Sequence, residues 1–99
     1  MKIPKSFQLF GTTINVIFDD EKCTDKSLYG ESIYSSKKIM LCDNLGIKKL
    51  SEDTIMDTFY HEKIHMILDS MSEHELSSNE KFVDIFAKLL RQSDVTAVL

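Results

Sequence analysis

The pattern of hydrophobic and polar positions divides the chain into two halves. In the first half, apolar residues partly alternate with polar ones and are often β-branched or aromatic, which is typical of strands. Residues 7–10 and 12–18 predict two strands, and Gly11 between them indicates a tight turn or a bulge. Residues 19–27 are charged and polar, and they predict a loop or a short helical turn.

A hairpin is expected next. Residues 28–33 and 38–41 have the composition of strands, and the polar residues 35–37 predict the turn between them. Residues 42–46 then close the sheet. We therefore expect residues 1–46 to form a small sheet of three or four strands that is mostly antiparallel.

The second half has helical periodicity. Ser51 is a suitable N-cap, and residues 51–71 carry apolar positions at helical spacing without a helix breaker. A second amphipathic helix is expected over residues 78–92, after a polar connection. Its start is indicated by Ser77 and Glu80, which have the spacing of a capping box.

Length and composition limit both fold and function. The 99 residues suffice for one hydrophobic core, so we expect a single α+β domain, residues 1–99, in which the sheet packs on the two helices. The net charge of −4 gives no basic surface that would indicate a nucleic-acid partner. No apolar segment has the length or the flanks of a secretory signal or a transmembrane helix, so no membrane partner is expected.

The two cysteines indicate the compartment. Cys23 and Cys42 lack the C-x-x-C spacing of redox and zinc motifs. Two thiols in a chain without an export signal are expected to be free and reduced. The sequence therefore predicts a cytoplasmic location.

The strongest chemical signal is the H-E-x-x-H motif from His61 to His65, which lies within the first predicted helix. Residues i and i+4 project from one helical face, so both imidazoles can bind one ion while Glu62 lies beside it. A catalytic zinc site needs two such ligands, a third ligand, and a carboxylate that takes a proton from zinc-bound water. We therefore predict a site for one Zn²⁺ per chain.

The third ligand has to come from outside the motif. Asp69 lies one turn beyond His65, but three ligands stacked along a straight helix would span about 12 Å and could not reach one ion. Met71 stands where metzincins have a histidine, which excludes that pattern. Glu80, at the start of the second helix, is the best candidate, and His74 in the polar connection is a reserve ligand.

Glu80 is followed one helical turn later by Asp84, on the same face. In gluzincins such a pair supplies a zinc ligand and an acceptor for the other nitrogen of a ligating histidine. That acceptor fixes the tautomer and the orientation of the ring. The alternative is that Glu80 only caps the helix together with Ser77, and that Asp84 is an exposed helix residue.

The two segments around these residues resemble a known family. Residues 58–69 (TFYHEKIHMILD) and 79–87 (NEKFVDIFA) are similar to the small H-E-x-x-H proteins of phages and prophages. Those proteins are in outline like the minigluzincins and, more distantly, the ImmA/IrrE-like metallopeptidases. The resemblance covers residues 51–92, and the leading sheet only in pattern.

The resemblance implies a minimal zincin-like fold, with a few strands over an active-site helix and a second helix that delivers a glutamate. It implies His61, His65 and Glu80 as zinc ligands and Glu62 as the catalytic carboxylate. It implies no particular substrate. The spacing from His65 to Glu80 is shorter than in thermolysin-like enzymes, so their substrate-binding elements are missing.

The expected activity is that of a zinc metallopeptidase acting on a peptide or protein substrate. Glu62 would accept a proton as water attacks the carbonyl, and would then pass it to the leaving amine. Tyr34 and His74 are candidates for the oxyanion donor. The hairpin over residues 28–41 is the expected sheet edge for an extended substrate.

Two other functions remain open. The first is a non-catalytic, zinc-stabilised accessory protein of phage type that binds a host protein. The retention of Glu62 argues against it, because a purely structural site does not need a glutamate that binds no metal. The second is a metal-free domain that acts only through its surface.

Overall fold

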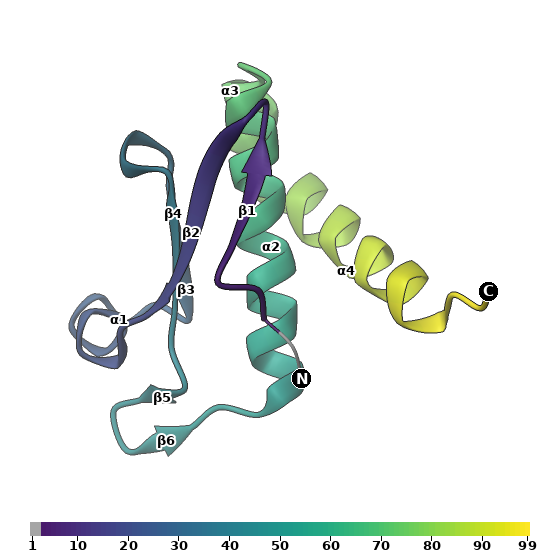
Figure 1. Ribbon diagram of the computed structural model, residues 1–99. Helices are drawn as coiled ribbons and strands as arrows, with labels where there is room; N and C mark the ends of the chain where they lie inside the picture. The colour runs from purple at the N-terminus through teal and green to yellow at the C-terminus, as the bar shows by residue number, and fades with distance from the viewer. Residues whose placement is uncertain (1–2) are drawn as a thin grey trace.

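The computed structural model describes residues 3–99 and has α+β architecture, as the sequence predicts (Figure 1). Four strands form one sheet, and two long helices lie on one side of it. In chain order the elements are β1 (Ser6–Leu9), β2 (Thr12–Phe18), α1 (Asp20–Lys26), β3 (Gly30–Ile33), the 3-10 turn η1 (Tyr34–Ser36), β4 (Lys38–Leu41), β5 (Asn44–Leu45), β6 (Lys48–Lys49), α2 (Glu52–Ser70), α3 (His74–Ser77) and α4 (Glu80–Thr96).

The main sheet is mixed, with strand order β1-β2-β4-β3. The pairs β1–β2 and β3–β4 are antiparallel, as predicted, and the central pair β2–β4 is parallel. Parallel neighbours need a crossover connection, and α1 followed by β3 supplies it. The predicted hairpin is therefore present as β3–β4, and β3 lies at an edge of the sheet.

The turn between β1 and β2 is tight, as Gly11 predicts. Phe10 and Gly11 both have positive φ, at 52° and 76°. Two consecutive residues of this kind make the two-residue turn that matches the twist of a hairpin, and glycine adopts the conformation without strain.

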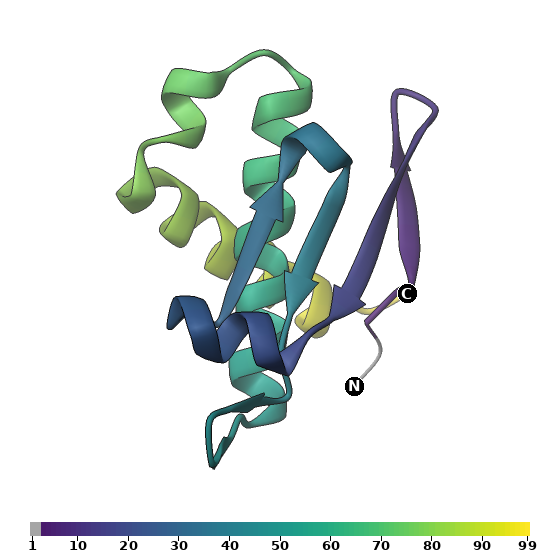
Figure 2. The same cartoon turned by 90° about the vertical axis from the view of Figure 1, so that its left-hand side faces the viewer.

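The main core lies between the sheet and α2, which runs across one face of it (Figure 2). Ile14, Ile39 and Leu41 point from the strands, and Phe59 and Met66 point from the helix; all are nearly inaccessible to solvent. Burying each such side chain contributes about 1.5–3 kcal/mol relative to leaving it exposed. The middle of α2 is thereby fixed against the sheet.

A second buried cluster joins α2 to α4. Ile64 and Leu68 of α2 pack against Val83 and Ala87 of α4. Further along, Arg91 pairs with Asp57 at 2.7 Å and with Asp53 at 2.9 Å. These contacts set the position of α4, and therefore of its first residue, relative to the face of α2.

The helix starts agree with the sequence for α2 and differ for α4. The hydroxyl of Ser51 accepts a hydrogen bond from the N–H of Thr54 at 3.1 Å and is the predicted N-cap. For α4 the cap is Asn79, so the predicted capping box of Ser77 with Glu80 is wrong. Ser77 is instead the last residue of the short helix α3, which lies within the predicted polar connection. Helix α4 also continues beyond residue 92, to Thr96.

The segment after β4 does not close the main sheet, contrary to the prediction. Residues 44–49 form a separate two-stranded sheet, β5–β6. Asp20, in the first turn of α1, holds this segment by accepting hydrogen bonds from the backbone N–H of Asp43 at 2.8 Å and the side chain of Asn44 at 3.0 Å. The polar residues before β3 thus form helix α1, and its first turn anchors the segment that follows β4.

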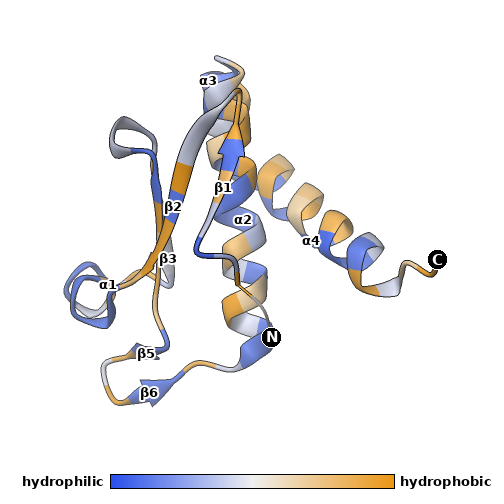
Figure 3. Ribbon diagram, in the orientation of Figure 1, coloured by the Kyte–Doolittle hydropathy of each residue, from blue (hydrophilic) through white to orange (hydrophobic). Residues whose placement is uncertain are grey.

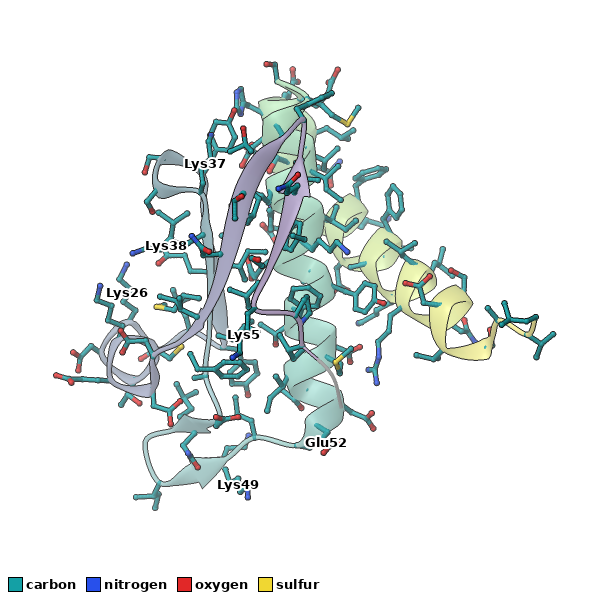
Figure 4. All side chains as sticks on the ribbon, in the orientation of Figure 1. Lys5, Lys26, Lys37, Lys38, Lys49 and Glu52 are labelled. Carbon is teal, nitrogen blue, oxygen red and sulfur yellow. The ribbon has the colours of Figure 1, made fainter. Side chains whose placement is uncertain are left out.

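Charge and apolar surface are distributed unevenly. Lys26, Lys37 and Lys38 project on the side of the sheet away from α2 (Figure 4). On α4, Phe86 and Leu89 are 43% and 61% exposed, and Figure 3 shows apolar and polar segments interspersed along the helix. Within residues 3–99, no helix is both long and apolar enough to cross a membrane.

Candidate metal centre

Three side chains converge where α2 and α4 meet. His61 and His65 project from one face of α2, and Glu80 is the first residue of α4. The short helix α3 reverses the chain between them, so Glu80 faces the two rings from across a tight connection. The structure therefore brings together the three ligands expected from the sequence.

The distances between the candidate ligand atoms are short and nearly equal. Nε2 of His61 lies 3.2 Å from Nε2 of His65, and the two nitrogens lie 3.1 Å from Oε2 and Oε1 of Glu80, respectively. Ligands about 2.0–2.1 Å from a zinc ion in tetrahedral geometry lie about 3.3–3.5 Å from one another. The three groups therefore fit one zinc ion with little adjustment.

Nδ1 of His65 faces Ser77, and Nε2 faces the cluster. The Oγ of Ser77 lies 3.0 Å from Nδ1 of His65 and also contacts the carbonyl oxygen of His65, to which it can donate at 3.5 Å. The hydroxyl can then accept a hydrogen bond from Nδ1–H. Because burial lowers the pKa of His65, its neutral form is favoured, and the proton on Nδ1 leaves Nε2 as a bare acceptor.

In this arrangement the lone pairs of two histidine nitrogens and of a carboxylate oxygen face the same point. Nε2 of His65 faces a carboxylate oxygen of Glu80 and the Nε2 atom of His61, all within about 3.2 Å. A proton on one ring can bridge two of these atoms, whereas a divalent cation satisfies all three at once. Of the groups that could occupy this point, a zinc-like cation suits the donor set best.

Asp84 lies on the expected side of His61 but is not in hydrogen-bond contact with it. Its Oδ1 is 3.8 Å from Nδ1 of His61, and its Oδ2 accepts a hydrogen bond from Lys88 at 3.1 Å. The carboxylate is half exposed, at 48% of its side chain. The orienting acceptor that the structure does supply, Ser77, acts on the other histidine.

Glu62 points into the space between β3 and the cluster. Burial raises the pKa of its carboxyl to about 7, the positive charge of His61 lowers it, and the neighbouring charge of Glu80 raises it. The backbone N–H of Ser32 in β3 hydrogen-bonds to the carboxylate and favours its charged form. A carboxyl with this pKa can accept and release a proton near neutral pH.

Tyr34 and His74 lie together, outside the cluster. Nδ1 of His74 is 2.9 Å from Oδ1 of Asp69, and its ring packs edge-on against Tyr34. Tyr34 lines a separate small hollow with Leu9 and Ser70. Among the described residues, neither side chain belongs to the group of converging ligands or borders the two hollows beside it, so the structure supports neither as the reserve ligand or the oxyanion donor considered from the sequence.

The H-E-x-x-H motif does not predict two residues that shape the site, Ser77 and Gly30. Ser77 lies twelve residues beyond His65 and is only 6% exposed, and nothing in its local sequence distinguishes it from a cap. Gly30 allows β3 to approach α2, because a Cβ atom there would lie 2.6 Å from Cγ2 of Thr58. A glycine inside a predicted strand is the signal that could have indicated such an approach.

Two hollows flank Glu62 along the edge strand. One has a volume of about 430 Å³ and is bordered by Ser32 of β3 and by the three candidate ligands. The other has about 380 Å³ and extends along α2 and α4. Both are bordered by Gly30, His61 and Glu62, so the two hollows adjoin, and we call them together the groove. Only the first is also bordered by His65 and Glu80.

No protein-family model, no curated protein and no solved structure matches this chain.

Proposed function

We propose that the protein is a zinc-dependent peptidase of gluzincin-like type, with one zinc ion held by His61, His65 and Glu80. The observation that carries this proposal is the convergence of three acceptor atoms beside the raised-pKa carboxyl of Glu62. A structural zinc site commonly has four protein ligands, whereas three ligands leave a position open for catalysis.

Each group at the site has a separate role in the proposed reaction. A zinc ion in this place supplies a Lewis acid that activates water and polarises a carbonyl. Glu62 accepts the proton of the attacking water and delivers it to the leaving amine. Ser77 keeps the ring of His65 in the ligating tautomer, and Ser32 holds the carboxylate of Glu62 through its backbone N–H.

The placement of β3 supports a peptide substrate. Its outer edge borders the groove, and an extended peptide can add to such an edge through main-chain hydrogen bonds. The two hollows have volumes of about 430 and 380 Å³, which is room for a few side chains only. This suits a narrow range of substrates better than general proteolysis.

The proposal includes a cytoplasmic setting. Cys23 and Cys42 are both buried and free, and burial raises the pKa of Cys23 to about 12. Burial also raises the pKa of Cys42, and the two thiols hydrogen-bond to each other. Two neighbouring thiols that stay unbridged suit a reducing compartment.

The decisive test compares wild type with Glu62→Gln, both loaded with zinc, on a mixture of short peptides analysed by mass spectrometry. Wild type should cleave peptides, and Glu62→Gln should retain zinc but lose turnover, because it lacks the proton acceptor and keeps every ligand. Glu21→Gln, an exposed change on α1, is the matched control and should behave as wild type. Equal cleavage by wild type and Glu62→Gln would refute the proposed role.

The second candidate is a non-catalytic, zinc-stabilised protein that binds a protein partner. The exposed apolar side chains of α4, including Phe86 and Leu89, are the feature that favours it. In that case zinc would bind with the same stoichiometry, and wild type and Glu62→Gln would both be inactive. The same experiment therefore separates the two candidates.

A further inference from the structure

The groove offers two different surfaces on its two sides. The side next to the cluster is bordered by polar groups, including Glu31 and Ser32 of β3. The other side, about 380 Å³ in volume, is bordered by Leu28 and Tyr29 before β3 and by Thr58 and Ala87 of the facing helices. We name this second side the Tyr29 hollow.

The charged side chains that border the Tyr29 hollow, apart from Glu62, are already paired. Asp57 binds Arg91 at 2.7 Å, and Asp84 binds Lys88 at 3.1 Å. An ion pair has little net charge to offer a third group. The hollow therefore has no built-in preference for a charged side chain of either sign.

Away from these charged groups, the wall of the hollow is formed mostly by carbon atoms. Leu28 and Tyr29 are large side chains that stay 36% and 44% exposed at the rim. The hydroxyl of Thr58 donates to the carbonyl of Thr54 at 2.8 Å, in its own helix, while its methyl group faces Gly30. The Thr58 hydroxyl is therefore already hydrogen-bonded within its own helix, and the hollow presents mostly carbon atoms to an occupant.

We propose that the Tyr29 hollow selects a large apolar side chain of a substrate peptide at a position next to the bond that is cleaved. The proposal rests on the proposed peptidase function and specifies its substrate class: extended polypeptides with a residue such as Leu, Met or Phe at this position. The volume is at the low end for a ligand pocket, which suits a single side chain rather than a whole small molecule.

The first test measures binding and needs no turnover. Zinc-loaded Glu62→Gln is titrated with short capped peptides that differ at one position, which is Leu, Ala, Lys or Asp, and affinity is followed by fluorescence anisotropy. Peptides with Leu should bind about tenfold or more tightly than those with Ala, because each buried methylene adds to discrimination. Equal affinity across the set, or the absence of binding, would overturn the proposal.

The second test changes the wall. Tyr29→Glu places an acid at the exposed rim, so the preference for Leu over Lys should fall about tenfold or reverse, while zinc content stays unchanged. Phe10→Glu is the matched control, an exposed aromatic residue on the β1–β2 turn, and should keep the wild-type preference. An unchanged preference in Tyr29→Glu would overturn the assignment of the hollow.

The two tests distinguish this inference from the parent proposal. Selective binding without cleavage by wild type would support the hollow and refute the peptidase. Cleavage by wild type without selectivity for an apolar residue would support the peptidase and refute the hollow.

Discussion

At the scale of single residues, the two candidate histidine ligands are held differently. His65 is fixed by a hydrogen bond between its Nδ1 and the buried Ser77, whereas His61 has Asp84 at 3.8 Å on the corresponding side. A ligating imidazole binds metal best when its other nitrogen has an acceptor. Ser77 is therefore the more important positioning residue of the two.

This difference predicts the effect of removing each partner. Ser77→Ala should weaken zinc binding up to about 10-fold in a chelator competition titration, because the ring of His65 loses the hydroxyl and keeps only its contact with the backbone of residue 77. Asp84→Ala should have a smaller effect. Ser77→Thr keeps a hydroxyl and should recover part of the affinity.

Ser78→Ala is the control for that series, because its hydroxyl bonds to the carbonyl of His74 and is exposed. It should leave the zinc affinity unchanged. Equal affinities of Ser77→Ala and Ser78→Ala would show that Ser77 does not orient His65.

The carboxyl of Glu62 predicts a pH effect in the metal-free protein. Its pKa of about 7 in the folded state exceeds its ordinary value of 4.5, so the folded state holds the proton more tightly than the unfolded state. The stability from this group is fully present below pH 4.5 and is lost as the pH rises through 7. The loss is about 3 kcal/mol.

Glu62→Gln lacks this titration and provides the comparison. With chelator present, the melting temperature of wild type relative to Glu62→Gln should fall as the pH is raised from about 4.5 to 8. The difference between the two proteins removes the contributions of the other titrating groups. Parallel melting curves over this range would contradict the raised pKa.

At the scale of elements, the site depends on where two helices begin and cross. Glu80 is the first residue of α4, and the preceding Asn79 caps that helix by accepting from the N–H of Phe82 at 3.1 Å. The buried contact of Val83 with α2 then fixes the distance between the helices. A change at the start of α4 should therefore affect both stability and metal binding.

Two cap variants separate these effects. Asn79→Ala should lower the free energy of unfolding by about 1 kcal/mol and also weaken zinc binding, since the turn that carries Glu80 loses its anchor. Ser51→Ala removes an equivalent cap from α2, far along that helix from His61, and should cost about the same stability with unchanged zinc affinity. Chemical unfolding and zinc titration of both variants provide the check. Identical zinc affinities would disprove the coupling.

The elements also show what the sequence could and could not predict. The strands of the main sheet and the two long helices were predicted from local periodicity, and the structure contains them. The convergence of the two histidines was predicted from their i, i+4 spacing on a helix, and the structure contains it as well. The parallel pairing of β2 with β4 and the contact of Ser77 with His65 depend on how distant segments fold together. The capping-box prediction failed because Asn79, an equally good cap, begins the helix after α3 has used Ser77.

At the scale of the whole molecule, the cluster joins the middle of α2 to the start of α4. Zinc bound there would link α2 to the start of α4, so its binding free energy would add to the folding free energy. The rest of the fold is held by two separate buried clusters, one under the sheet and one between the helices. The metal-free protein should therefore stay folded but be less stable.

Chelation should accordingly lower the melting temperature of wild type. At a free zinc concentration about 100-fold above the Kd, binding adds about 2.7 kcal/mol, which corresponds to roughly 10 °C or more in a domain of this size. Glu80→Ala should show a much smaller difference between zinc and chelator in the same scanning calorimetry. A wild-type melting temperature that does not depend on zinc would contradict the structural role of the site.

The most direct test of the central claim is the zinc content of protein purified without added metal, measured by elemental analysis. Wild type should carry about one zinc per chain, and His61→Ala, His65→Ala and Glu80→Ala should each retain much less, because two remaining ligands bind weakly. A metal-free wild type, or full zinc content in both single histidine variants, would contradict the metal centre.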